Sequence, residues 1–179
     1  MPTQPHMIEA LLRSQLMANM TDEERRDLAL RFEVRPFSAG QTLIAEGSEG
    51  RKLLEILAGT AEVRVRDGDH GYRVARLGPG SISGEAAFYA GSARGADVIG
   101  TSEGIVAVLP RTAYISLVQQ NSAAAEALDR TVLEHLSRRV VETNARLEAL
   151  LTARQEGGLK GALQAMLGIK DSVPVVDHG

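Results

Sequence analysis

The spacing of hydrophobic positions changes twice along the chain and divides it into three zones. From about Met7 to Leu30 the apolar residues keep helical spacing, and Thr21-Asp22-Glu23-Glu24 has the pattern of a capping box that begins a second short helix. From Phe32 to Leu109 apolar and polar residues alternate in short runs separated by glycine and proline. Helical spacing returns after Pro110. The pattern predicts an α+β chain whose β-rich zone lies between helices.

The central zone carries the signals of short antiparallel strands. Residues Ala61–Arg66 alternate strictly, a turn rich in Asp and Gly follows at 67–71, and Tyr72–Leu77 alternates again, which predicts a hairpin. The apolar run Ile105–Leu109 has the length of a buried strand. Strands of this spacing predict an antiparallel β-barrel or jelly roll rather than a parallel sheet with crossover helices.

The C-terminal zone predicts a short helix over 111–120 and a long helix from Ala123 to Arg154 that ends at Gly157-Gly158. Within the long helix, apolar residues recur at alternating steps of three and four, as in a heptad seam. The members of the seam are Leu133, Leu136, Val140, Thr143, Leu147 and Leu150, with a second stripe at Leu128 and Val132. The seam suits either a homodimer through helix 123–154 or packing back onto the β-rich zone.

These patterns predict four segments. N-terminal helices occupy 1–30 and the β-barrel occupies 31–120. The long C-terminal helix, a lid or dimerisation element, occupies 121–155, and a flexible tail occupies 156–179.

Composition argues against several classes of function. The chain has no cysteine, which removes disulfides, thiol nucleophiles and zinc–thiolate sites, and its four histidines are scattered, so we expect no metal site. A net charge of −3 argues against a surface that binds nucleic acid. No apolar run approaches the roughly 20 residues of a membrane span, and no signal peptide is present, so a cytoplasmic location is expected. The motifs of a nucleophile elbow and a Walker loop are missing, and we predict no enzyme and no catalytic residue.

The segment Ser83–Val98 is the richest in candidate chemistry. It places the carboxylate of Glu85 and the guanidinium of Arg94 nine positions apart among small residues, which allow backbone N–H groups to approach a phosphate. A helix that begins near Gly84 would add unpaired N–H groups. Arg94 suits phosphate oxygens and Glu85 suits a ribose hydroxyl. A surface arginine and a helix-capping carboxylate are the structural alternatives, but the combination predicts a pocket for a small nucleotide.

Four pieces of the sequence, in this order, resemble the cyclic nucleotide-binding domain family, which includes catabolite-activator-type regulators and kinase regulatory subunits. They are Glu46-Gly47 with Leu53–Val63, Leu77–Gly80, Gly84–Val98, and Leu136–Leu147, and the resemblance runs from about Arg31 to Leu151. It implies that Arg94 pairs with the phosphate and Glu85 with the ribose 2′-hydroxyl. The ligand-binding set that it implies is Gly84, Glu85, Ala86, Ala87, Arg94, Gly95 and Ala96.

Two departures from the family pattern affect the expected site. Gly95 stands where a residue with a hydroxyl or a small residue is frequent, and the glycine removes a possible side-chain contact with phosphate. Asp97 stands where many cAMP-binding members have Thr or a bulky residue. If its carboxylate points into the pocket it repels phosphate or prefers a donor such as a guanine edge, and if it points outward it is neutral. Leu54, in place of the usual aromatic, is a change of core packing only.

The resemblance implies a regulatory sensor in signal transduction, with a cyclic nucleotide as ligand (cAMP by default, cGMP as the other candidate), no cofactor, and a signal passed through the C-terminal helix to an unknown effector. A transcription regulator of the catabolite-activator type is the first alternative. Its helix-turn-helix module needs roughly 50–70 residues, but 25 follow Arg154, so no DNA partner is expected. A non-binding interaction module with the same fold is the second alternative.

Overall fold

The computed structural model describes residues 4–67 and 70–167. The chain divides into two units, one ending at Leu133 and the other beginning at Glu134. The helices are α1 (Gln4–Leu12), the 3-10 helix η1 (Gln15–Met17), α2 (Asp22–Ala29), α3 (Glu85–Ala90), α4 (Arg111–Gln119) and α5 (Ala123–Leu167). The strands are β1 (Glu33–Phe37), β2 (Thr42–Ile44), β3 (Lys52–Ala58), β4 (Ala61–Asp67), β5 (His70–Leu77), β6 (Ile82–Ser83), β7 (Asp97–Gly100) and β8 (Gly104–Pro110).

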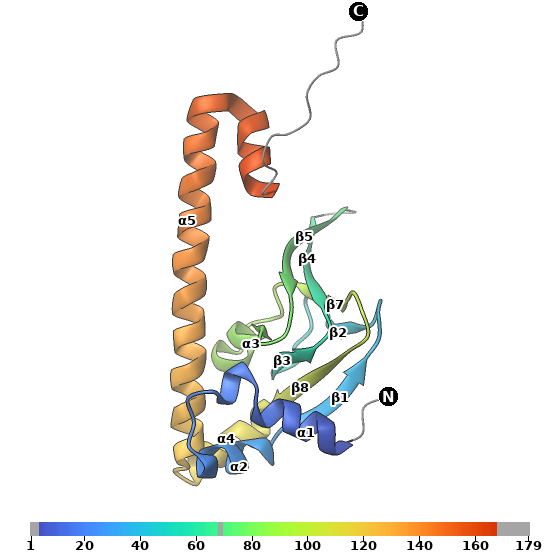
Figure 1. The fold of residues 1–179 in the computed structure, drawn as a ribbon, viewed down its shortest axis with the longest axis vertical. Coiled ribbons are helices and arrows are strands. Elements are labelled where there is room, and N and C mark those ends of the chain that lie inside the picture. Colours follow the sequence, from blue (N-terminus) through green and yellow to red (C-terminus); the bar gives the residue numbers. More distant parts are fainter. Residues whose placement is uncertain (1–3, 68–69, 168–179) are drawn as a thin grey trace, which may run out of the picture. The chain divides into compact units, whose positions relative to one another are not determined.

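In the part of the chain that the structure describes, the strands form two antiparallel four-stranded sheets, with orders β1-β8-β3-β6 and β2-β7-β4-β5. The predicted hairpin is confirmed, because β4 and β5 pair from Ala61↔Leu77 to Asp67↔His70. The predicted jelly roll is also confirmed, although the sheets are open and do not close into a barrel. Figure 1 shows the β4–β5 hairpin at the end of the sheets opposite to α1, α2 and α4.

The central strands β3 and β8 are buried on both faces, which explains why Ile105–Leu109 is apolar throughout. Successive side chains of a strand point to opposite faces. Leu54, Ile56, Val106 and Val108 join the core between the sheets. Leu53, Glu55, Ala107 and Leu109 are buried on the other face, where Glu55 accepts a hydrogen bond from the segment between α1 and α2.

The predicted capping box of α2 is present. The Glu24 backbone N–H donates to Oγ1 of Thr21 at 3.3 Å, and the Thr21 N–H donates to Oε2 of Glu24 at 2.7 Å. The predicted end of the long helix is wrong, since α5 continues through Gly157-Gly158 to Leu167. Two glycines cost a helix about 2 kcal/mol relative to alanine, and the Ala, Leu, Gln and Glu residues around them favour it. Of the predicted tail, residues 168–179 lie outside the described part.

Among the described residues, no helix combines the length and the apolar character that crossing a membrane requires.

Candidate functional site

The Gly84–Asp97 segment, here called the cassette, begins at a turn that requires glycine. Gly84 follows β6 with φ +92° in the left-handed region and directly precedes α3, so a short helix does begin beside it. A Cβ atom at Gly84 would clash with the guanidinium of Arg94 and would lie 2.7 Å from the backbone oxygen of Lys52. The Arg94 guanidinium therefore occupies the space that a side chain at residue 84 would need.

Arg94 is buried, with 6% of its surface exposed. Its Nη1 donates to the carbonyl oxygen of Gly84 at 3.0 Å and its Nη2 donates to that of Lys52 at 2.7 Å. Burial lowers the pKa of the Arg94 guanidinium, and the Glu85 carboxylate opposes this shift. A guanidinium has five N–H donors, so these two bonds fix its plane and leave donors for an anion.

The loop between β2 and β3 holds the backbone of Arg94. The Gly47 N–H donates to the Arg94 oxygen at 2.8 Å, and the Arg94 N–H donates to the Ser48 oxygen at 3.1 Å. Both bonds lie outside regular sheet pairing, so the loop and the cassette are fixed to each other near the charged groups. Apart from the Glu46-Gly47 turn, no pattern in the sequence indicates these contacts.

The structure brings three of the predicted site residues together. Glu85, the first residue of α3, is buried at 6% exposure and lies within electrostatic reach of Arg94, which is bonded to Gly84. The other four differ in exposure: Ala86 and Gly95 are exposed, Ala96 is half-buried and Ala87 is buried in the core. A buried carboxylate and a buried guanidinium at the start of a helix can receive a ligand that carries both a hydroxyl and an anionic group.

Both carboxylate oxygens of Asp97 accept hydrogen bonds from other residues of the chain. Its Oδ1 accepts the backbone N–H of Glu46 at 2.7 Å, and its Oδ2 accepts Nε and Nη2 of Arg66 at 3.1 and 2.9 Å. The Glu46 N–H, with Arg66, lowers the pKa of Asp97. The Glu46 side chain in turn accepts the backbone N–H of Arg66 at 2.9 Å. The carboxylate therefore joins the cassette to β4 and to the β2–β3 loop, a role that sequence reasoning missed.

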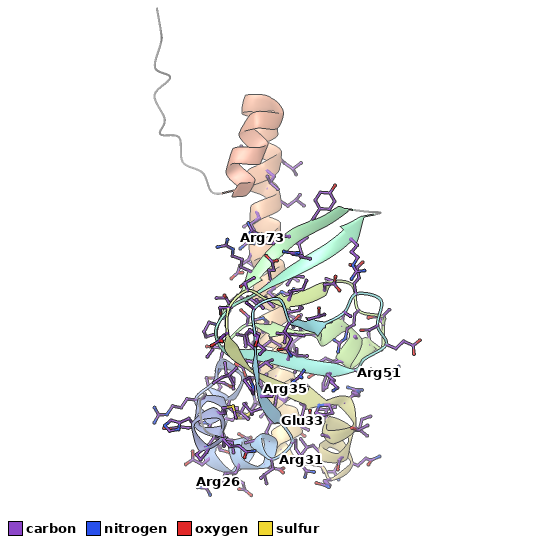
Figure 2. The ribbon with its side chains drawn as sticks, turned by 90° about the vertical axis from the view of Figure 1, so that its right-hand side faces the viewer. Arg26, Arg31, Glu33, Arg35, Arg51 and Arg73 are labelled. Atoms are coloured by element: carbon purple, nitrogen blue, oxygen red, sulfur yellow. The ribbon has the colours of Figure 1, made fainter. Side chains whose placement is uncertain are left out.

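A second arginine lies at the other end of α3. Gly91, with φ +72°, ends the helix, and a Cβ atom there would lie 2.7 Å from Nη2 of Arg51. Figure 2 labels Arg51 on the side of the sheets, well away from Arg73 on the β4–β5 hairpin. Both glycines that bound α3 are thus covered by a guanidinium, but only that of Arg94 is buried.

A further buried carboxyl lies outside the cassette. Glu55 is fully buried on the helix-facing side of β3, and its Oε1 accepts the Leu16 N–H at 3.1 Å. Burial raises the pKa of Glu55 to about 7, although backbone N–H groups of the η1 segment limit the rise. A cavity of about 240 Å³ opens nearby and is lined by Ala10, Arg13, Ser14, Gln15, Ile56, Leu57, Pro79 and Gly80. The sequence signal that could have identified Glu55 is an acidic residue within the apolar run Leu53–Ala58.

Two antiparallel sheets with helices at both ends, and a glycine-bounded short helix beside a buried Glu–Arg pair, define a jelly-roll domain with a charged, glycine-rich cassette. Residues 34–121 match the family described as the cyclic nucleotide-binding domain, and this part of the chain belongs to that family. The resemblance inferred from the sequence is confirmed at this level.

Three known proteins illustrate the similarity. The crystal structure of a cyclic nucleotide-binding domain from Methylobacillus flagellatus KT superposes with a TM-score of 0.69. The match covers 79% of this chain and 80% of that chain, and the two sequences are 25% identical. The cAMP-dependent protein kinase regulatory subunit of Colletotrichum orbiculare is 29% identical over 113 residues, which is 63% of this chain and 28% of that protein. Glutaminase 2 of Bradyrhizobium diazoefficiens is 29% identical over 135 residues, 75% of this chain and 21% of that protein. The chain thus spans less than a third of each curated relative.

Proposed function

We propose that the cassette binds a cyclic nucleotide and that the chain acts as a regulatory sensor. In this proposal Arg94 pairs with the phosphate and Glu85 accepts a hydrogen bond from the ribose 2′-hydroxyl. The backbone at Gly84, Ala86 and Ala87 donates N–H groups to the ligand, and Gly95 and Ala96 complete the site. The observation that carries the proposal is the buried guanidinium of Arg94, fixed by two carbonyl oxygens beside a buried carboxylate.

The position of Asp97 supports binding over a non-binding interaction module. A carboxylate directed at the phosphate would oppose an anionic ligand. Both oxygens of Asp97 instead accept hydrogen bonds from Glu46 and Arg66, whose charge offsets that of the carboxylate. This departure from the family pattern therefore does not weigh against binding. The guanine-edge preference has no support from this arrangement either, so we propose cAMP as the first ligand to test and cGMP as the second.

The relatives favour a regulatory role without chemistry. The relative from Colletotrichum orbiculare is the regulatory subunit of a cAMP-dependent protein kinase. The glutaminase match covers 21% of that enzyme, and we propose that the shared segment contributes regulation rather than catalysis. The absence of cysteine from this chain is compatible with a reducing compartment, and we propose a cytoplasmic location.

We further propose that α5 carries the output, either to an effector protein or through a homodimer. The two stripes of the helix differ in exposure. Leu128 and Val132 are buried, whereas Leu133, Val140 and Leu147 are 65%, 58% and 54% exposed. An exposed seam at heptad spacing is suited to pairing with the same seam of a second copy.

Isothermal titration with cAMP and cGMP tests the binding site. We expect one of them to bind the wild-type protein, and we expect Arg94→Ala to weaken binding by about 100-fold, as for the loss of charge-assisted hydrogen bonds. Glu85→Gln tests the ribose contact. Arg51→Ala is the matched control, since it removes an arginine from the other end of the same helix. No heat with either nucleotide, or equal affinities for Arg94→Ala and wild type, would overturn the proposal.

A further inference from the structure

The second half of α3 lies in a cluster of aromatic rings. The chain has only three Phe and three Tyr, and half of them meet here: Phe88 and Tyr89 from α3 and Tyr114 from α4. Their ring centroids lie 5.0, 5.3 and 5.8 Å apart in edge-to-face arrangements. The guanidinium carbon of Arg111 lies 5.0 to 5.8 Å from the same three centroids. Such contacts hold the cassette helix against the start of α4.

Both tyrosine hydroxyls of this cluster converge on one carboxylate of α5. The Tyr89 hydroxyl donates to Oδ1 of Asp129 at 2.8 Å. The Tyr114 hydroxyl lies 2.9 Å from Oδ1 and 2.7 Å from Oδ2 of the same residue. Asp129 belongs to the part of α5 that forms one unit with the sheets. A single side chain of α5 thus reaches the cassette helix and α4 at the same time.

The two hydroxyls keep their protons throughout the neutral range. Burial, followed by the bond to Asp129, raises the pKa of Tyr89 well above its usual range. The same causes raise the pKa of Tyr114 to about 12. Hydrogen bonds from a hydroxyl to a charged acceptor are stronger than neutral ones. Both hydroxyls are therefore available as donors to Asp129 at neutral pH.

The cassette helix is held at both of its ends by different parts of the fold. Arg94 grips the Gly84 turn in front of it, and Asp129 holds Tyr89 near its end. The helix between them has six residues, a length of about 9 Å, so a shift at one end is transmitted to the other. Any ligand that requires the start of α3 in one position also acts on the bond to Asp129.

We infer that Asp129 is a positioning residue for the cassette, and that through Tyr89 it couples ligand affinity to the docking of α5 residues 123–133. This inference rests on the proposed function of the cassette. Coupling of this kind is reciprocal: docking of α5 raises the affinity of the cassette, and the ligand stabilises the docked first turns of α5. The Tyr114 hydroxyl shares the carboxylate but belongs to α4, so its hydrogen bonds anchor α5 without acting directly on the cassette.

Two variants that each lose one hydroxyl test the inference. Tyr89→Phe and Tyr114→Phe keep both rings and remove a hydrogen bond to the same acceptor, so similar losses of stability are expected. Titration with cAMP or cGMP is expected to show an affinity about five- to tenfold lower for Tyr89→Phe and within about twofold of wild type for Tyr114→Phe. Asp129→Asn, which keeps the shape and removes the charge, is expected to weaken binding as Tyr89→Phe does.

Hydrogen–deuterium exchange supplies the second readout. Nucleotide is expected to slow exchange at residues 123–133 of the wild type but not of Tyr89→Phe. Equal affinities for the two Tyr→Phe variants, or equal protection of α5 in wild type and Tyr89→Phe, would overturn the coupling. If neither nucleotide binds the wild type, the proposed function fails separately. In that case faster exchange at residues 85–94 of ligand-free Tyr89→Phe, but not of Tyr114→Phe, still supports positioning by Asp129, and unchanged exchange refutes it.

Discussion

Replacement of Glu55 by Gln is expected to remove a pH dependence from the stability of the fold. The Glu55 side chain is fully buried between β3 and the η1 segment, and its Oε1 accepts the Leu16 N–H at 3.1 Å. Among the described residues its Oε2 has no hydrogen-bond partner. Glutamine has the same shape and can accept the same bond, but it carries no titratable proton. The substitution therefore isolates the protonation of this carboxyl from its packing.

The magnitude follows from the shift in pKa. Burial raises the pKa of Glu55 from 4.5 to about 7. Between these values the folded protein holds a proton that the unfolded chain has released, so stability falls as pH rises. The contribution is fully present below pH 4.5 and is lost as the pH rises through about 7. At about 1.36 kcal/mol per pKa unit, the free energy of unfolding loses about 3 kcal/mol over the whole window and about 2.5 kcal/mol between about pH 5 and 8.

Urea unfolding of wild type and Glu55→Gln between about pH 5 and pH 8 measures this effect. The difference in unfolding free energy between the two proteins is expected to change by about 2.5 kcal/mol over this range, with the wild type losing stability as pH rises. Glu33→Gln, at an exposed position of β1 (Figure 2), controls for the removal of one negative charge. Parallel curves for wild type and Glu55→Gln would refute the reasoning.

Three further substitutions test other parts of the account. Gly84→Ala is expected to lower nucleotide affinity at least tenfold, because its Cβ meets Arg94 and a backbone oxygen. The control Gly91→Ala has similar φ strain, but its Cβ meets only the movable side chain of Arg51, so calorimetry should measure a smaller loss of affinity. Gly95→Ser is expected to raise nucleotide affinity about three- to tenfold, because a Cβ there meets no atom within 4 Å and the hydroxyl can reach the phosphate. Gly95→Ala, which adds the Cβ without the hydroxyl, should leave the measured affinity unchanged. Val140→Glu is expected to produce monomers in sedimentation velocity, and a monomeric wild type would contradict the proposed seam.

Local patterns predicted most of the fold because they act over short stretches of sequence. The capping box at Thr21, the alternation of β4 and β5, and the glycine before α3 each depend on neighbours within a few residues. The predicted end of α5 at Gly157-Gly158 was wrong, because two glycines weaken a helix without ending it. The choice between a barrel and an open jelly roll stayed undecided in the sequence, because alternation fixes the faces of strands but not whether the outer strands pair.

The long-range contacts of the site could not be predicted from the sequence. Asp97 pairs with a residue of β4, Arg94 with the first residue of β3, and Asp129 with a tyrosine forty positions earlier. No local pattern encodes such pairs, because they depend on how the strands and helices come together. Glu55 differs from these residues. An acidic residue within a buried strand indicates an unusual environment, although the sequence does not identify its hydrogen-bond partner.

The most direct test of the central claim is the change in backbone amide chemical shifts when cAMP or cGMP is added to the labelled protein. We expect the largest changes on residues 84–97, including the amides of Ala86 and Gly95, and we expect Arg94→Ala to abolish them. Changes centred elsewhere, or changes in the cassette that persist in Arg94→Ala, would contradict the claim.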